Sequence, residues 1–109
     1  MILNLTKKRV LAKNFEKKEG FGKIKGMLGR KTPKTLYFKT RFGIHTFFLK
    51  FSIDLVVLDK NKKIVFLKRN IKPNKIVVWN PRFNKVIELP AGFLFRSKTK
   101  KGDILTFKG

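Results

Sequence analysis

The clearest hydrophobic pattern in the chain lies between residues 44 and 59, where apolar side chains recur at every second position. One parity is apolar and carries Phe47, Leu49, Phe51, Ile53, Leu55 and Val57. The other parity is mixed and includes Thr46, Lys50, Ser52 and Asp54. A period of two is typical of half-buried β-strands. We therefore expect two strands in this segment, with a bend near Ser52.

Shorter apolar runs elsewhere predict further strands. They cover residues 2–5, 9–15, 35–39, 64–68, 76–79, 85–89 and 104–107. Turn-forming residues separate them, as in the hairpin turn expected at residues 59–63. Two segments, 20–30 and 93–97, have the character of a short helix or helical turn. Many short strands with frequent turns predict a mainly β fold: one domain over residues 1–109, a small β-sandwich or jelly-roll-like barrel with one or two short helices.

The charge of the chain says most about its surface. There are 28 Lys+Arg against 6 Asp+Glu, a net charge of +22 in 109 residues. A hydrophobic content of 42% with 12 Phe indicates a folded domain and not a disordered basic tail. Self-repulsion at this charge destabilises a compact state unless anions, salt or a partner screen it. A bias of composition toward Lys is the alternative explanation, and the sequence leaves it open.

The basic residues gather at the expected turns, so we predict a surface that binds nucleic acid backbone or another polyanion. Its residues would be Lys60, Lys62, Lys63, Lys68, Arg69, Trp79, Arg82, Lys98, Lys100 and Lys101. Trp79 is included as an exposed aromatic beside Arg82, able to stack on a base. Because most of these residues are Lys, binding should be tolerant of sequence. Runs of charge are often only solvated surface, and they form a binding footprint if they converge at one end of the fold.

A second hypothesis is a cleft formed by Arg30, His45, Asp54 and Glu88, which would suit a small enzyme or a ligand-binding domain. A histidine beside a carboxylate can move protons near neutral pH. Asp54 interrupts an apolar strand, so we expect backbone N–H groups or an arginine such as Arg30 or Arg41 to bind it. We favour structural roles for Asp54, His45 and Glu88, and lean toward a non-catalytic binding module.

Several classes of site are not expected. The chain has no Cys and a single His, which leaves no thiolate or multi-histidine metal site. We expect no metal and no cofactor. The longest clean apolar run in the body of the chain, residues 55–58, is far shorter than a membrane span, and no export signal is visible. We therefore expect a cytoplasmic protein with no membrane partner, and the oligomeric state stays open.

Five segments in order resemble DUF192, a family of small prokaryotic domains of unknown function. They are GMLGR at 26–30, IHTFFLKFSIDLVVLD at 44–59, Pro73, VIELPAG at 86–92 and GDIL at 102–105. The agreement covers about residues 20 to 107 and implies a β-rich sandwich of jelly-roll type. It implies no activity, because none is established for the family. The IHTFF form at 44–48 is similar to an archaeal or thermophile-type branch, and Ser52 stands where the family usually has Pro.

Overall fold

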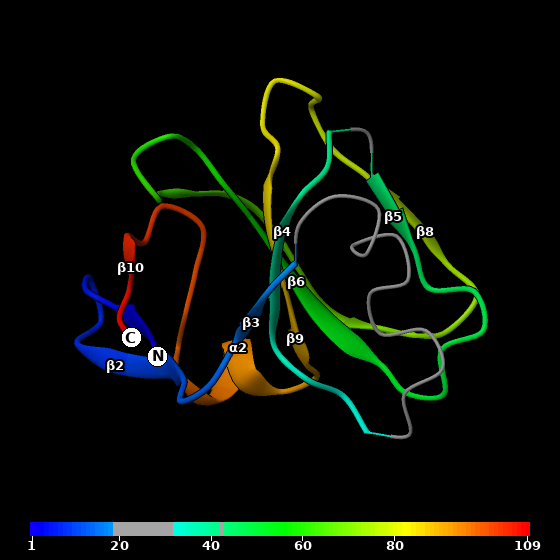
Figure 1. Cartoon of the computed structure of the whole chain (residues 1–109), viewed down its shortest axis with the longest axis horizontal. Helices are drawn as coiled ribbons and strands as arrows, with labels where there is room; N and C mark the ends of the chain where they lie inside the picture. Colours follow the sequence, from blue (N-terminus) through cyan, green and yellow to red (C-terminus); the bar gives the residue numbers. More distant parts are fainter. Residues whose placement is uncertain (19–31, 42) are drawn as a thin grey trace.

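A computed structural model of the chain describes residues 1–18, 32–41 and 43–109. The expected helical turn at 20–30 and the candidate Arg30 lie outside these residues. The central layer of the fold is a five-stranded sheet (Figure 1). In spatial order its strands are β3 (Glu16–Lys17), β4 (Leu36–Lys39), β9 (Lys85–Pro90), β6 (Ile53–Leu58) and β7 (Ile64–Ile71).

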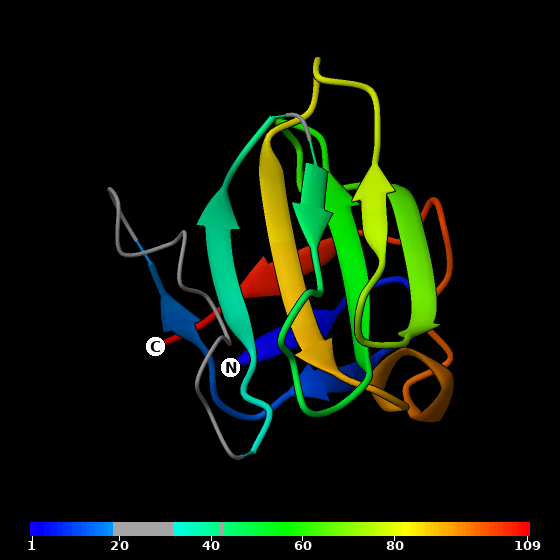
Figure 2. The same cartoon turned by 90° about the vertical axis from the view of Figure 1, so that its right-hand side faces the viewer.

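Two smaller sheets cover the two faces of the central sheet (Figure 2). On one side lies a three-stranded sheet of β10 (Leu105–Phe107), β1 (Ile2–Asn4) and β2 (Arg9–Ala12), whose strands run across those of the central sheet. The first and last strands of the chain therefore pair with each other. On the other side lies a two-stranded ribbon of β5 (Gly43–His45) and β8 (Ile76–Val78).

The core is divided by the central sheet into two clusters. The first cluster lies against β10, β1 and β2, and includes Val56 and Leu58 of β6. The second lies against the β5–β8 ribbon, and includes Leu55 and Val57. All six residues of β6 are buried, because the smaller sheets cover both faces of the central sheet. A strand that is covered on both faces tends to be apolar at both parities. This is why the mixed parity of residues 44–59 turns wholly apolar between Leu55 and Leu58.

The predicted fold class is confirmed: the protein is a small, mainly β sandwich. In the described part of the chain the sheets stay separate, and none closes into a barrel. The long alternating segment contains two strands, as expected, but they belong to different layers, with turns at residues 46–52 between them. The helical turn expected at 93–97 is the short helix α2 (Phe93–Arg96). No helix in the described ranges is long and apolar enough to cross a bilayer.

Candidate polyanion-binding groove

The hairpin between β6 and β7 holds the first basic run on a well-defined turn. The carboxylate of Asp59 accepts hydrogen bonds from the backbone N–H groups of Asn61 (2.8 Å) and Lys63 (2.9 Å). An Asp side chain that bonds its own following backbone is a common way to close a tight turn. The turn leaves Lys60 and Lys63 exposed.

The second basic run, at residues 98–101, is brought against this hairpin by backbone pairing. Ile64 donates its N–H to the Asp103 carbonyl (2.9 Å), and Gly102 donates to the Ile64 carbonyl (2.8 Å). Lys63 and Ile104 form an isolated antiparallel bridge. Two basic segments that are far apart in the sequence therefore lie side by side along β7.

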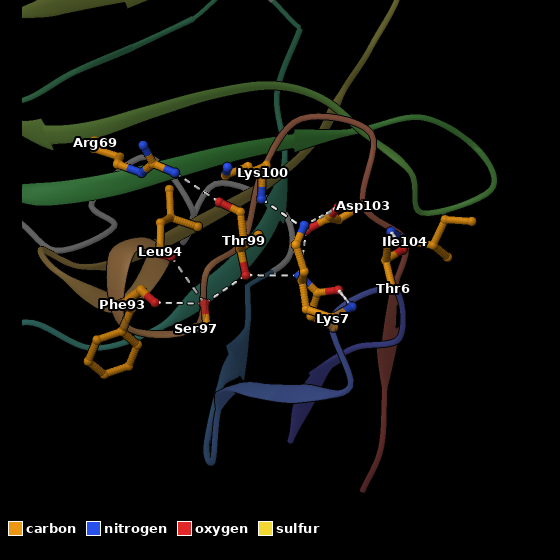
Figure 3. A network of polar contacts seen from close by, with 11 residues as sticks. Thr6, Lys7, Arg69, Phe93, Leu94, Ser97, Thr99, Lys100, Asp103 and Ile104 are labelled. Atoms are coloured by element: carbon orange, nitrogen blue, oxygen red, sulfur yellow. Dashed lines mark hydrogen bonds and ion pairs between the residues drawn. The ribbon is translucent and has the colours of Figure 1, made fainter.

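A buried polar network anchors the segment that carries the second run (Figure 3). Ser97 Oγ and Thr99 Oγ1 are 2.7 Å apart. The Asn4 amide of β1 donates to Thr99 Oγ1 (3.0 Å) and to Asp103 Oδ2 (2.9 Å). All four side chains are buried, and a polar network that is fully satisfied in the interior is rigid. The network therefore holds residues 97–103 in one conformation.

Asp103 is the ionic member of this network. Its carboxylate accepts from the Lys7 ammonium (2.9 Å) and from the Lys100 backbone N–H (3.0 Å). Burial acts to raise the pKa of Asp103, but hydrogen bonds from Asn4, Lys7 and the Lys100 N–H outweigh it, and the pKa falls below its usual value. The carboxylate is therefore charged at neutral pH and paired with Lys7. Asp103 bonds the backbone N–H of Lys100 and not its ammonium group. The ammonium can therefore bind a ligand.

Between β7 and this segment lies a groove of about 420 Å³. It is lined by Val65, Phe66, Leu67, Arg69, Lys100 and Lys101, and is called the β7 groove below. One guanidinium nitrogen of Arg69 donates to the Thr99 carbonyl (3.0 Å), so Arg69 spans the groove and leaves other donors free for a ligand. Three cations on an apolar floor, with no acidic residue in the lining, make an anion-attracting site.

The remaining basic residues of the prediction are spread more widely. Lys98 is exposed beside the groove, at the end of α2. Lys62 is half-buried, with its ammonium 5.8 Å from the centre of the Phe107 ring. Lys68 is exposed but projects from the face of β7 opposite to Arg69, because neighbouring side chains of a strand alternate. Arg82 lies between β8 and β9 and takes no part in the groove.

The expectation that Trp79 is exposed is wrong. Its side chain is only 8% exposed and belongs to the second core cluster. The indole N–H donates to the Phe83 carbonyl (2.8 Å), which explains how a polar group is accommodated there. Among the described aromatic side chains, Phe48 (83%) and Phe95 (80%) are the most exposed. Phenylalanines near strand spacing resemble core residues, so the sequence does not single these two out.

Asp54 proves to be bound by backbone N–H groups, the first of the two alternatives considered. Its carboxylate accepts from Asn70 (2.8 Å), Gly92 (3.1 Å) and Leu94 (3.0 Å). The last two belong to the start of α2, where the first N–H groups lack partners within the helix. The N-cap residue, Gly92, has no side chain to supply a cap. Asp54 therefore caps α2 from a distant strand.

Glu88 lies on the opposite face of the central sheet from Asp54. Its cross-strand neighbours are Leu36 and Leu55, both in the second cluster. Burial raises the pKa of Glu88 to about 7. No hydrogen bond joins its carboxylate to any other described residue. It is the most perturbed carboxyl in the described part of the chain.

His45 is exposed on the outer face of the ribbon, since Ile44 before it packs into the second cluster. His45 is thus exposed, whereas Asp54 and Glu88 are buried on opposite faces of the central sheet, and the structure does not bring these three residues into one cleft. None of them lines a larger hollow of about 830 Å³ between β2, β3 and α2. Residues 1–18, 32–41 and 43–109 also contain no group of three His, Asp or Glu side chains that could hold a metal ion.

The fold and the groove thus define a basic β-sandwich domain with a cationic edge. The chain matches the DUF192 family model, described as uncharacterized ACR, over residues 11–107. It belongs to this family, and the match begins earlier than the resemblance noted in the sequence. No curated protein matches the chain.

Two solved structures are similar to it. One is a protein of unknown function from Novosphingobium aromaticivorans, with a TM-score of 0.73 and 14% identity over 86% of this chain and 73% of that one. The other, from Sinorhizobium meliloti, is named as a candidate transcription regulator, with a TM-score of 0.68 and 17% identity over 85% of this chain and 78% of that one. At these identities the likeness concerns the fold alone.

Proposed function

We propose that this protein is a non-catalytic module that binds polyanions, with nucleic acid backbone as its main target, through the β7 groove. The observation that carries the proposal is the convergence of two basic runs on one edge of the fold. Arg69 comes from the basic pair Lys68–Arg69 on β7, and Lys100 and Lys101 come from the run at 98–101. A surface of this kind attracts phosphate groups and displaces their counterions, which makes binding strong at low salt and weak at high salt.

Other features of the molecule also support polyanion binding. Self-repulsion at +22 is relieved when a polyanion binds. The separation of His45, Asp54 and Glu88 gives no support to a cleft formed by these three side chains. A regulator of transcription, as the Sinorhizobium meliloti protein is named, would use such a surface. We further propose that the chain acts in the cytoplasm, where nucleic acids are abundant, and that its IHTFF segment marks an archaeal or thermophile-type branch of the family.

The test is a titration of labelled oligonucleotides at salt concentrations between about 50 and 300 mM. We expect dissociation constants in the micromolar range at low salt, little dependence on base sequence, and a steep loss of affinity with salt. The triple variant Arg69→Ala, Lys100→Ala, Lys101→Ala should weaken binding at least about tenfold and lower the slope of log K against log salt by about 2.

The matched control removes the same charge elsewhere, at exposed Lys13, Arg82 and Lys108. It should change affinity far less than the groove variant does. Equal losses for the two variants would show that net charge, and not the β7 groove, attracts the ligand. Binding that is absent at low salt, or unaffected by salt, would reject the proposal altogether.

A further inference from the structure

Three aromatic side chains are exposed together at the end of the β5–β8 ribbon. His45 and Phe47 lie on the same side of the backbone because Thr46 between them points inward and is fully buried. Their rings stack, with centroids 5.2 Å apart and planes 26° from parallel. Phe48 follows and is 83% exposed. His45, Phe47 and Phe48 are called the aromatic loop below.

The backbone of this loop is held firmly, although its rings face solvent. Thr46 donates its hydroxyl to the Lys72 carbonyl (2.7 Å) and accepts from the Lys75 N–H (2.8 Å). The Thr46 N–H also donates to the Lys75 carbonyl (2.8 Å). One buried threonine thus fastens the loop to the connection between β7 and β8. This connection places the exposed Lys72 and Lys75 beside the aromatic rings.

Phe48 adopts a backbone conformation that is unfavourable for a bulky residue. Its φ is +67°, a region that bulky residues rarely adopt and that costs free energy. Its ring gains no burial in return. Residues held in strained backbone conformations cluster at functional sites. This strain is a second observation, beside the exposure of the three rings, that favours a binding role for the loop.

The charge around the loop determines the kind of partner. Lys50 follows the loop in the sequence, Lys72 and Lys75 belong to the connection that bonds Thr46, and no acidic residue occurs in residues 43–50 or 72–78. A second copy of this chain would bring another net charge of +22 and would be repelled. The partner must therefore be anionic and must offer flat or apolar faces to the rings. Single-stranded nucleic acid has both properties, since every base has a π face.

The loop and the β7 groove are joined by one stretch of backbone. β7 runs past Arg69 to Ile71, and Lys72, whose carbonyl bonds Thr46, follows directly. The segment that forms the groove with β7 is anchored to β1, on one side of the central sheet, whereas the loop ends the β5–β8 ribbon on the other side. Because β7 is an edge strand of the central sheet, a single strand whose phosphates occupy the groove would pass around this edge to bring its next bases to the rings.

We propose that the aromatic loop is a stacking platform that selects single-stranded nucleic acid, with Phe48 and the His45–Phe47 pair contacting bases. The inference rests on the proposed function and narrows its ligand from polyanions in general to unpaired strands. The lysines beside the loop hold the backbone of the strand, and the apolar shelf of Ile76 and Val78, each 66% exposed, lies next to the rings. Neither element reads the identity of the base.

The experiment compares two ligands of equal charge: a thymidine oligonucleotide of about twelve nucleotides and an abasic strand of the same length. Phe48→Gly removes the ring and suits the positive φ, so the variant should fold at least as well as the wild type. We expect it to weaken thymidine binding about tenfold and to leave abasic binding unchanged. Phe95→Ala, at an equally exposed ring on α2, is the matched control and should change neither.

The other outcomes separate this inference from the proposed function. If Phe48→Gly leaves both affinities unchanged while the groove variant lowers both, the protein binds polyanions but the aromatic loop takes no part. If duplex binds as tightly as the single strand, selection of unpaired strands is wrong. If Phe48→Gly abolishes binding to vesicles of phosphatidylglycerol and leaves thymidine binding intact, the loop contacts a lipid surface instead.

Discussion

The buried carboxylates of this strongly basic protein differ in whether hydrogen bonds stabilise their charge. Asp54 and Asp103 are buried and bonded by several donors each. Glu88 is buried between leucines and has no bond to another described residue. Folding therefore stabilises the charge of Asp103 but opposes the charge of Glu88, since burial favours the protonated form of a carboxyl.

Replacing Glu88 by Gln should change the pH dependence of stability. The pKa of Glu88 rises from 4.5 in the unfolded chain to about 7 in the folded protein. Below pH 4.5 the carboxyl is protonated in both states and costs nothing. As pH rises to 7 only the unfolded state ionises, so stability falls, by roughly 3 kcal/mol in total. Above pH 7 the cost is constant. Relative to wild type, Glu88→Gln should therefore gain stability between pH 4.5 and 7.

The measurement is urea unfolding of both proteins at pH 4.5 and pH 8. The difference between variant and wild type should be more favourable to the variant at pH 8. The same difference at both pH values would show that Glu88 titrates normally in the folded protein. Glu16→Gln is the control, because Glu16 forms surface ion pairs with Lys18 and Lys34 that are worth little.

At the scale of elements, the segment between α2 and β10 has little regular structure, yet it positions half of the β7 groove. Backbone pairing of residues 102–104 with Lys63 and Ile64 brings this segment to β7, and the two ends of the chain meet because β10 lies beside β1. Asn4 of β1 then reaches both Thr99 and Asp103. The groove therefore depends on contacts between the first and the last tenth of the sequence.

Asp103→Asn should lower both stability and polyanion affinity. The change weakens the bond with the Lys7 ammonium and leaves an amide where donors converge, at a cost of about 2 kcal/mol. Because the pKa of Asp103 is lowered in the folded state, this stabilisation is present at neutral pH and is lost as pH falls below the ordinary value of 3.8. The variant should approach the wild type in stability near pH 2.

Thermal unfolding at pH 7 and pH 2 measures the first effect, and oligonucleotide titration the second. Lys34→Ala, which removes a surface ion pair with Glu16, is a control that should alter neither by much. Full affinity in an Asp103→Asn variant that is measurably less stable would mean that Lys100 and Lys101 bind without a fixed backbone.

At the scale of the whole molecule, a net charge of +22 should make stability depend on salt. Self-repulsion is greatest at low ionic strength, where the Debye length is about 30 Å, similar to the 34 Å longest dimension of the fold. We expect Tm to rise between about 10 and 150 mM salt as repulsion is screened. A polyanion at low salt should raise Tm further, because it binds the folded state.

Differential scanning calorimetry with NaCl, and then with short polyphosphate, checks both effects. Polyphosphate should act at concentrations far below those of NaCl, and the groove variant should lose part of that advantage. A Tm independent of salt would show that the charges are too dispersed to repel one another.

The sequence alone determined the class of the fold and most of its strands, because period-two patterns and turn residues are local properties of the chain. It also indicated which segments are basic and which carboxylate needed hydrogen-bond donors.

Tertiary structure decided which of these features meet. The alternation around Trp79 does not say which face of the sheet another layer covers. The sequence therefore suggested an exposed Trp79, whereas the side chain is buried. Phe48, in contrast, is exposed on a turn and has a positive φ. Thr46, at the start of this turn, is hydrogen-bonded to Lys72, which lies 26 residues further along the chain. Likewise, Arg69 and the run at 98–101 share one groove because residues 102–104 pair with the start of β7, and contacts between distant segments cannot be read from a local pattern.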